Sequence, residues 1–327
     1  MGGFLSVNLF KNDRPVGSTD GKGLLLVEWV MIGYVILTML LMLFWHDRLQ
    51  NLEPMVRLRL QAILIVLALW GLYWLLPCRF TMMLRILAQV VLLSEWYPET
   101  FEFNRVLPNL DHLFATWEQQ LFGFQPALLF SQKFPSPWVS ELLTLGYVSY
   151  FPLMIIVPLF YLIYRYNEFL RASFVMLSAF FAFYVIFIFL PVAGPQYYYL
   201  ATGLDTIAQG IFPNIGHYFE THSEALPAPG YADGVFYKLL LQAHAAGERP
   251  TAAFPSSHVG VTTLLLWQAW ATRNRRFFWS LVPFGLLMFF ATFYIQAHYA
   301  IDAIAGLFVG TAMYYGFGWL YGRLQKP

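Results

Sequence analysis

Residues 254–302 carry the strongest structural signal in the chain and read FPSSHVGVTTLLLWQAWATRNRRFFWSLVPFGLLMFFATFYIQAHYAID. Two short motifs bound this stretch, Phe254–His258 at its start and His298–Asp302 at its end, and the residues between them are nearly all apolar. The histidines of the two motifs are 40 residues apart. That is about one passage across a bilayer and back, at ~20 residues for each spanning helix. We therefore expect a helical hairpin that brings His258 and His298 to the same membrane face.

The composition of the whole chain is that of a membrane protein. Of its 327 residues, 59% are hydrophobic and 11% are charged, and a soluble domain does not need so large an apolar fraction. The net charge is +1 and the basic residues are scattered between apolar runs, so we expect no nucleic-acid partner. Cys78 is the single cysteine, which excludes an intrachain disulfide and a cysteine metal cluster. The polar first residues argue against a cleavable signal peptide, and the apolar run from Leu24 is expected to be an uncleaved anchor.

The apolar runs predict an all-α, polytopic membrane protein with about eight transmembrane helices. Seven runs are Leu24–Trp45, Leu58–Leu76, Leu142–Tyr164, Phe169–Leu190, Val259–Trp270 with its polar flanks, Phe277–Tyr294 and Tyr299–Tyr321. An eighth, Met82–Trp96, is short and carries Arg85 and Glu95, so it spans, tilts or lies partly in the interface. Residues 79–327 are expected to form a catalytic membrane core with six helices. Residues 1–78 are expected to form a cytoplasmic tail and two accessory transmembrane helices.

Two further segments lie outside these runs. In residues 106–122, apolar residues recur at helical spacing, and polar residues that include Asp111 and Glu118 fill the other side. This pattern is typical of an interfacial amphipathic helix; an ordinary extramembrane helix packed on loops is the alternative. The large loop 191–257 leads into the first motif, and loops of such length are usually functional.

The distribution of lysine and arginine predicts the orientation. With eight spans, twelve of the nineteen Lys and Arg residues lie on the side of the N-terminus, and they include the run Arg273-Asn274-Arg275-Arg276. Cytoplasmic loops carry the excess of basic residues. We therefore expect an integral membrane protein, in the plasma membrane or an inner membrane if bacterial, with its active site on the non-cytoplasmic side. Arg48, Arg57 and Arg59 oppose this assignment.

The first motif combines the start of a helix with a histidine. Ser256 or Ser257 is expected to cap the helix that follows Pro255. The first backbone N–H groups of that helix have no internal partner, so they and the two serines form a candidate phosphate site. In the first turn, His258 can donate a proton to a leaving oxygen or take one from an attacking hydroxyl. A capped helix with an interfacial histidine is the alternative.

The second motif places a histidine and a carboxylate on one helical face, because His298 and Asp302 are four residues apart. A carboxylate there can keep one imidazole nitrogen protonated and leave the other free to attack. Ionisable residues at membrane spans are usually functional, although a His–Asp pair that only stabilises packing is the alternative. Gly306 and Gly310 follow at a spacing that lets helices approach closely, and we expect them to pack against the helix that begins at His258.

Four other polar residues are candidates for binding the phosphate or the headgroup. Gln196 follows a Gly-Pro turn, and Gln296 precedes His298. Arg249 and Lys238 lie upstream of the first motif, where each could balance phosphate charge. A solvated loop cation is the alternative for both.

The two motifs resemble those of the type-2 phosphatidic acid phosphatase superfamily, over roughly residues 111–322. The Pro-Ser-x-His element of that family matches Pro255–His258, and its His-Tyr-x-x-Asp element matches His298–Asp302. The most similar branch contains inositol phosphorylceramide synthases and, more distantly, sphingomyelin synthases. The resemblance implies that the second histidine forms a phosphohistidine, that the aspartate orients it, and that the first histidine is acid and base. It implies a six-helix core and no required metal or cofactor.

The sequence departs from the phosphatases of that superfamily where they bind phosphate. Those phosphatases carry a lysine, six residues and then Arg-Pro; here Arg249-Pro250 is present, but Lys238 is too far upstream. They also carry Ser-Arg ahead of the final histidine, where this chain has Ala291 and Thr292. These departures favour the transferase branch over simple lipid phosphatase activity.

The sequence therefore predicts an integral membrane phosphotransferase. It would move a phosphorylated headgroup, with phosphoinositol the first choice, from a glycerophospholipid to a ceramide-like or diacylglycerol-like acceptor. Its partners would be these donor and acceptor lipids, and the sequence demands no protein partner. The alternative is a lipid phosphate or polyprenyl diphosphate phosphatase that uses the same His-His-Asp site. A non-catalytic lipid-binding or transport component is a third possibility, which the intact motifs disfavour.

Overall fold

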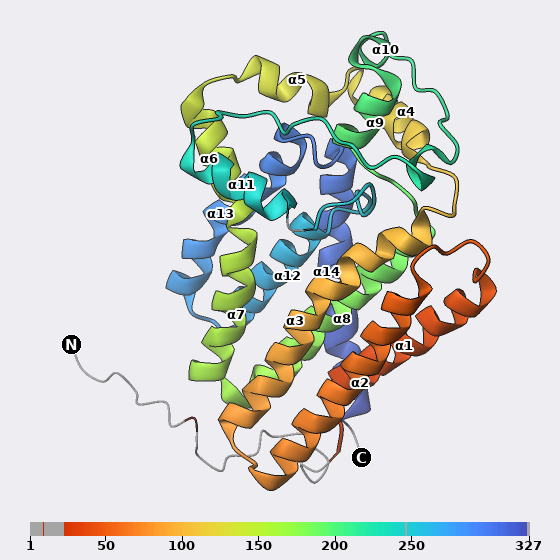
Figure 1. Cartoon of the computed structure of the whole chain (residues 1–327). Helices are drawn as coiled ribbons and strands as arrows, with labels where there is room; N and C mark the ends of the chain where they lie inside the picture. Colours follow the sequence, from red (N-terminus) through yellow and green to blue (C-terminus); the bar gives the residue numbers. More distant parts are fainter. Residues whose placement is uncertain (1–8, 10–22, 246, 326–327) are drawn as a thin grey trace.

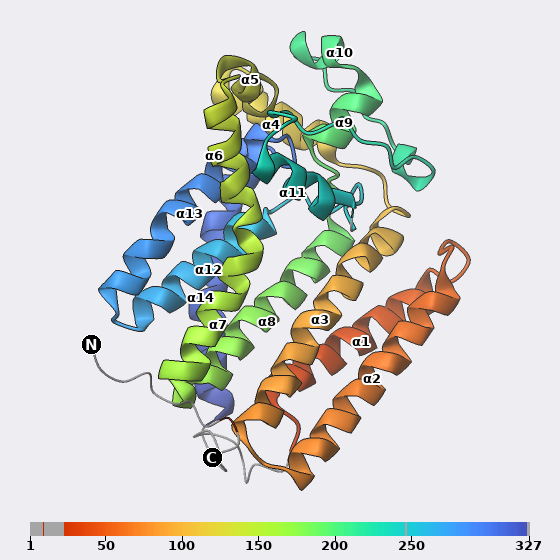
Figure 2. The same cartoon turned by 60° about the vertical axis from the view of Figure 1, so that its left-hand side comes forward.

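The computed structural model describes residues 9, 23–245 and 247–325, and these residues form helices and no strand. Long helices make a bundle, and short helices lie together over one end of it (Figure 1; Figure 2). The long helices are α1 (Leu26–Phe44), α2 (Leu52–Leu75), α3 (Arg79–Asn104), α6 (Pro137–Val148), α7 (Tyr150–Tyr164), α8 (Tyr166–Phe189), α12 (Ser257–Ala271), α13 (Arg275–Tyr294) and α14 (Ala300–Leu324). The short helices are α4 (Asp111–Phe122), α5 (Pro126–Lys133), α9 (Pro195–Thr202), α10 (Leu204–Ala208), η1 (Tyr218–Glu220) and α11 (Val235–Ala245).

The protein is a membrane protein with several apolar spanning helices. Among the described residues, α1, α2, α8, α13 and α14 are long and apolar enough to cross a membrane, which makes five spans, or six if the bent pair α6–α7 counts as one. The expected number was eight. The two helices that fall outside the five or six are α12, which has 15 residues, and α3, which carries several charged side chains along its 26 residues. At 1.5 Å per residue, a helix as short as α12 is shorter than the ~30 Å hydrocarbon core.

The observed helices start or end a few residues from the expected spans, and two of those spans differ more than this. The short run Met82–Trp96 lies inside the single longer helix α3. The expected span Leu142–Tyr164 is divided at Ser149 into α6 and α7, which are bent by 43°. Pro152 gives the physical reason, because it has no N–H for the carbonyl of Val148 and its ring collides with that carbonyl.

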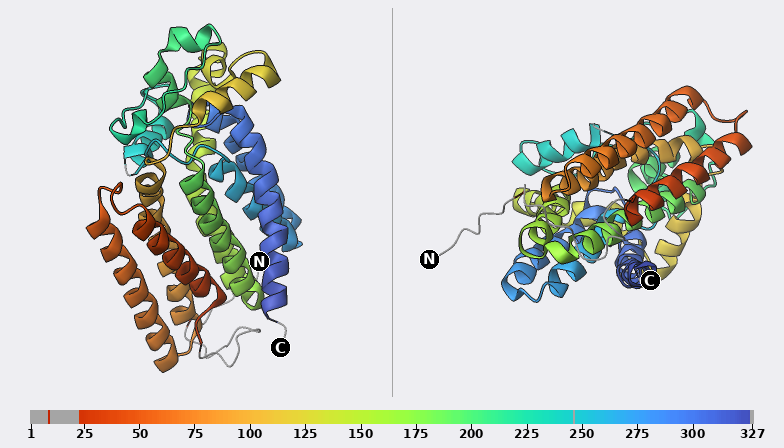
Figure 3. Two further views of the ribbon diagram at one scale, coloured as in Figure 1. Left: turned by 90° about the vertical axis from the view of Figure 1, so that its right-hand side faces the viewer. Right: turned by 90° about the horizontal axis from the view of Figure 1, so that it is seen from below.

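Two buried ion pairs join α1 and α2 to α3. Arg85 of α3 donates to Glu28 near the start of α1, and both side chains are 1% exposed. Arg59 of α2 makes two hydrogen bonds, of 2.7 and 2.9 Å, to the carboxylate of Glu99 near the end of α3. Charges in a membrane are costly unless they are paired, so the pairs fix how α1 and α2 pack on α3. Seen from the side, α1 and α2 lie at one edge of the bundle and α14 lies at the opposite edge (Figure 3).

The helices α12 and α14 approach each other closely at two glycines. A Cβ at Gly310 would lie 2.1 Å from the carbonyl oxygen of Gly260, and a Cβ at Gly306 would lie 2.5 Å from that of Ser256. The backbone N–H of Ser256 also donates to the carbonyl oxygen of Asp302 at 3.0 Å. The expected packing role of the two glycines agrees with this contact, which brings the start of α12 against the start of α14.

The amphipathic segment is a helix only from Asp111 onward, as α4. Its acidic residues do not line the exposed side, because Asp111 and Glu118 are fully buried. The exposed side instead carries Trp117 and Leu121, which are 51% and 64% exposed. The helix is therefore amphipathic with its acidic face turned into the protein.

Candidate active site

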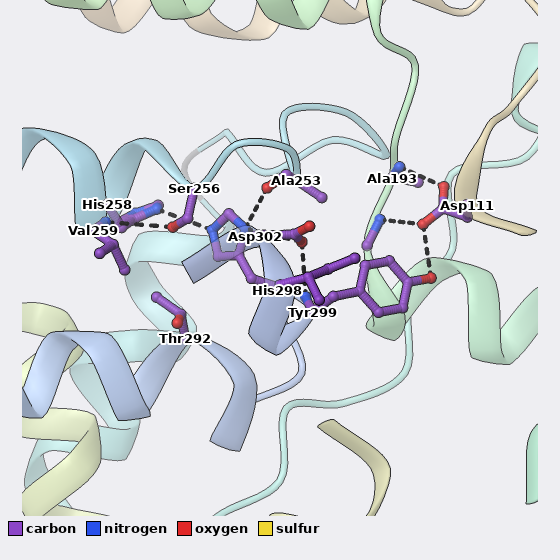
Figure 4. A network of polar contacts seen from close by, with 12 residues as sticks. Asp111, Ala193, Ala253, Ser256, His258, Val259, Thr292, His298, Tyr299 and Asp302 are labelled. Atoms are coloured by element: carbon purple, nitrogen blue, oxygen red, sulfur yellow. Dashed lines mark hydrogen bonds and ion pairs between the residues drawn. The ribbon is translucent and has the colours of Figure 1, made fainter. Parts of the chain in front are cut away.

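The two motif histidines lie together where α12 and α14 begin (Figure 4). The Nε2 atom of His298 is 3.5 Å from the Nδ1 atom of His258, and the ring centroids are 5.7 Å apart. His258 belongs to the first turn of α12, and His298 lies in the short loop before α14. The pair is thus formed by the contact between these two helices.

The tautomer of His298 is set by the main chain. Its Nδ1 atom lies 2.7 Å from the carbonyl oxygen of Ala253. A carbonyl only accepts hydrogen bonds, so Nδ1 carries the hydrogen and Nε2, which faces His258, keeps a free lone pair. Burial lowers the pKa of His298 to about 4, so the ring is uncharged near neutral pH.

Asp302 was expected to orient His298, but it lies just beyond hydrogen-bond distance. Its Oδ2 atom is 3.8 Å from Nδ1 of His298 and accepts a hydrogen bond from the backbone N–H of Tyr299 at 2.8 Å. Its Oδ1 atom is buried with no hydrogen-bond partner among the described residues. Asp302 therefore caps the start of α14 and places a buried acidic group beside the histidine.

Two tyrosines pack against the ring of His258. Tyr147 stacks on it with the ring centroids 4.6 Å apart, and Tyr150 contacts it at the same centroid distance with its ring tilted. The tyrosines belong to α6 and α7, on either side of the bend at Ser149. The bend therefore places one aromatic side chain from each helix against this histidine.

The start of α12, where the sequence predicts an anion site, lies beside the histidine pair. Ser256 is the cap, because its hydroxyl accepts a hydrogen bond from the N–H of Val259 at 3.4 Å. Ser257 is the first residue of the helix and is buried beside His258. The N-terminal N–H groups of α12 therefore lie at the histidine pair, where they favour an anion.

The two glutamines stabilise the surrounding main chain. The side chain of Gln296 donates to the carbonyl oxygen of Ala127 at 3.2 Å. The backbone N–H of Gln196 donates to the carbonyl oxygen of Gln296 at 2.9 Å, and its side chain donates to Glu248 at 3.0 Å. Both side chains are buried and already hydrogen-bonded.

The two candidate cations lie at the surface. Lys238 is exposed on α11. Arg249 is also exposed, and its guanidinium donates to the carbonyl oxygen of Glu248 at 3.1 Å. The structure therefore does not bring either side chain into the histidine pair.

A second acidic and basic pair, which the sequence reasoning missed, lies behind the histidines. Oε2 of Glu248 is 3.0 Å from Nε2 of His244, and the ring of Tyr147 contacts His244 at 5.9 Å as well as His258. Burial raises the pKa of Glu248 to about 7 and lowers the pKa of His244 to about 4. The signal in the sequence was the four-residue spacing, which is the same as in the second motif. Among the described residues, no group of three or more His, Cys, Asp and Glu side chains is arranged to hold a metal ion.

These features define a helical membrane protein with two histidines at paired helix starts. Residues 112–316 match the model of the PAP2 superfamily, and this range includes both motifs. The chain belongs to the PAP2 superfamily. No curated protein and no solved structure matches it. Membership and the membrane-spanning helices together indicate an enzyme of the lipid phosphatase or phosphotransferase type.

Proposed function

We propose that this protein is an integral membrane phosphotransferase of the inositol phosphorylceramide synthase-like branch. It transfers phosphoinositol from a glycerophospholipid to a ceramide-like or diacylglycerol-like acceptor. The observation that carries the proposal is the unprotonated Nε2 atom of His298, which lies 3.5 Å from Nδ1 of His258 while its own Nδ1 is held by the carbonyl of Ala253. A buried, neutral imidazole with its other nitrogen fixed has the geometry of a nucleophile.

The transfer has two steps. In the first, Nε2 of His298 attacks the phosphorus of the donor lipid, a P–N bond forms, and the P–O bond to diacylglycerol breaks. His258 gives its proton to the leaving oxygen. In the second, His258 takes the proton of the acceptor hydroxyl, the new P–O bond forms, and the P–N bond breaks. The carbonyl of Ala253 keeps the Nδ1 hydrogen in place throughout, and Asp302 at 3.8 Å stabilises the positive charge that develops on the ring.

The surroundings of the pair support transfer of a phosphodiester rather than hydrolysis of a phosphomonoester. A monoester is a dianion near neutral pH and needs cations, whereas a diester carries one negative charge. Thr292 stands where the phosphatases have arginine, and Arg249 and Lys238 are exposed. Besides His298, the rings of Tyr147 and Tyr150 pack against His258. His298 is 4% exposed, and exclusion of water favours transfer to a lipid hydroxyl over transfer to water.

We also propose that α3, the bent pair α6–α7, α8, α12 together with its polar flanks, α13 and α14 form the six-helix core, and that α1 and α2 complete eight spans. The active site then faces away from the cytoplasm. The basic run at residues 273–276 supports this orientation, because it follows the end of α12 that is opposite to His258 and cytoplasmic loops are enriched in arginine. The short helices over the site would lie at the non-cytoplasmic surface.

The test uses the full chain, purified and placed in phosphatidylcholine vesicles that contain inositol-labelled phosphatidylinositol. With ceramide present, we expect label in a new lipid, and His298→Ala should abolish it. Release of inorganic phosphate from phosphatidic acid or a polyprenyl diphosphate, without any acceptor lipid, would instead select the phosphatase alternative. A His298→Ala variant with full activity would contradict any role of this site in catalysis.

A further inference from the structure

Asp111 is a buried carboxylate that accepts four hydrogen bonds, and Figure 4 shows those from Ala193 and Tyr299. Its Oδ1 atom accepts from the backbone N–H of Gly194 at 2.8 Å and from the hydroxyl of Tyr299 at 3.0 Å. Its Oδ2 atom accepts from the backbone N–H of Ala193 at 2.6 Å and from the side chain of Asn109 at 2.5 Å. A carboxylate has about four lone-pair sites, so this one is fully used by groups from three separate segments.

Two of these contacts connect Asp111 to His298, the proposed nucleophile. Tyr299 is the residue that follows His298, so its hydroxyl ties the loop before α14 to Asp111. On the other side, Val192, in the same turn as Ala193, accepts a hydrogen bond from the backbone N–H of Ala253 at 3.0 Å. The carbonyl of Ala253 in turn holds Nδ1 of His298.

Direct packing strengthens the connection that runs through the 192–194 turn. Gly194 has a positive φ of 95°, and a Cβ at this position would lie 2.6 Å from the carbonyl oxygen of Ala297, the residue before His298. The 192–194 turn, which Asp111 holds, therefore lies in backbone contact with the loop before α14 that carries His298. A shift of this turn would move that loop.

We propose that Asp111 is a positioning residue, which fixes His298 through Tyr299 on one side and through the 192–194 turn and Ala253 on the other. The inference rests on the proposed role of His298 as nucleophile. Asp111 itself contacts neither imidazole, so its effect passes through the residues that it holds.

A second carboxylate on the same face of α4 acts on the next residues of the chain. Glu118 is seven residues after Asp111, which is about two helical turns, and both side chains are fully buried. Its Oε2 atom accepts from the backbone N–H of Ile301 at 3.2 Å. The acidic face of α4 therefore bonds to the segment 299–301 twice, through Asp111 to Tyr299 and through Glu118 to Ile301. In this way α4 supports the loop before α14 that carries His298.

The test compares Asp111→Asn with Tyr299→Phe. An amide presents an NH₂ group in place of one carboxylate oxygen, so Asp111→Asn loses two of the four hydrogen bonds, whereas Tyr299→Phe loses one. A displacement of about 1 Å can cost about a hundredfold in rate. We therefore expect Asp111→Asn to lower kcat of the transfer reaction by about tenfold to a hundredfold with little change in KM. Tyr299→Phe should lower kcat less, and the double variant should lose less than the sum of the two single effects in free energy, because both changes loosen the same loop before α14.

A second readout does not need the transfer reaction. The rate at which diethyl pyrocarbonate modifies His298, followed by mass spectrometry of the peptide, should rise several-fold in Asp111→Asn because the ring is held less firmly. If the wild-type protein shows no transfer but this rise is seen, the proposed function fails and the positioning role stands. If Asp111→Asn does not fold, Tyr299→Phe carries the same test.

The matched control is Asn274→Ala, which removes the side-chain cap of α13, where Asn274 accepts from the N–H of Phe277 at 3.1 Å. This cap lies before α13, away from the histidine pair. It should lower thermal stability and leave kcat and His298 reactivity unchanged. Asp111→Asn and Tyr299→Phe variants that behave like this control, with lower stability alone, would overturn the positioning role.

Discussion

His298 gives its Nδ1 hydrogen to the carbonyl oxygen of Ala253 at 2.7 Å, whereas the carboxylate of Asp302 lies 3.8 Å away. Ala253 belongs to the loop that leads into the first motif, two residues before Pro255. The main chain just before the first motif therefore sets the tautomer of His298 in the second motif. In a Ser-His-Asp triad the aspartate carboxylate fixes the tautomer of the histidine. Replacing that aspartate with asparagine disturbs the tautomer in a triad, whereas here the carbonyl of Ala253 would still fix it.

Asp302→Asn should retain measurable transfer activity. The amide oxygen can still accept the hydrogen bond from Tyr299, and Ala253 still fixes the tautomer of His298, so only the negative charge near the ring is lost. We expect a decrease of about tenfold to a hundredfold in kcat, well short of the ~10⁴-fold loss seen when a triad loses its orienting carboxylate. The measurement is transfer of labelled headgroup under saturating lipid, beside His298→Ala. Equal losses in the two variants would mean that Asp302 does orient the nucleophile.

The acid limb of the pH profile should lie near pH 4. Burial lowers the pKa of His298 to about 4, compared with about 6.5 for an exposed histidine. The nucleophile must be unprotonated, so kcat/KM should stay high as the pH falls through 6.5 and decrease only as it approaches 4. The same shift makes the folded state bind fewer protons than the unfolded chain between these values, so His298 contributes stability that is lost as the pH falls below about 6.5. An acid limb centred near 6.5 would contradict a buried, neutral nucleophile.

Substrate binding should weaken above pH 7 because of Glu248. Burial raises its pKa to about 7. Its carboxyl group lies 3.0 Å from His244 and accepts a hydrogen bond from Gln196, and it interacts electrostatically with Tyr97, Tyr147, Tyr197 and His298. Below pH 7 the carboxyl group is neutral. Above pH 7 it becomes an anion in a site that must accept an anionic headgroup, so KM should rise while kcat changes less.

The variant that tests this is Glu248→Gln, which keeps the size and the hydrogen-bonding side chain but cannot ionise. We expect its KM to be flat from pH 6 to pH 9. Glu224→Gln is the matched control, because Glu224 is an exposed glutamate in the same long loop and should keep the wild-type profile. An unchanged alkaline rise of KM in Glu248→Gln would assign that rise to another group.

The sequence predicted those parts of the site that depend on spacing along helices. An apolar run of about 40 residues between His258 and His298 predicted a common face, and the two rings lie together there. The glycines at 306 and 310 predicted the close contact of α14 with the helix that carries His258. These features depend on the spacing of apolar residues and glycines along a helix, which can be read from a single sequence.

Other parts of the site leave no such record. The partner of His298 is the carbonyl of Ala253, and a main-chain oxygen is present at every residue, so no side chain marks it. The acidic residues of α4 were visible, but a helical pattern separates two faces without saying which of them faces the protein. Trp117 is half exposed and Asp111 is fully buried, because at a bilayer the apolar face can contact lipid while the polar face satisfies hydrogen bonds inside. The break at Ser149 was also readable in principle, since Pro152 follows it by three residues.

The distance between the two histidines depends on the contact of α12 with α14, and Gly310→Ala should increase it. The new Cβ would lie 2.1 Å from the carbonyl oxygen of Gly260 and 2.7 Å from its Cα. These are backbone atoms, so the helices must separate. Overpacking of this kind costs about 1–3 kcal/mol, and a displacement near 1 Å at reacting groups costs about a hundredfold in rate. We therefore expect a lower unfolding temperature together with a large loss of transfer activity.

Gly316→Ala on the same helix is the control, because a Cβ there meets nothing within 4 Å and alanine favours the helix by up to about 1 kcal/mol. A Gly310→Ala protein as stable and as active as Gly316→Ala would show that the close approach of these helices is not what brings His258 and His298 together.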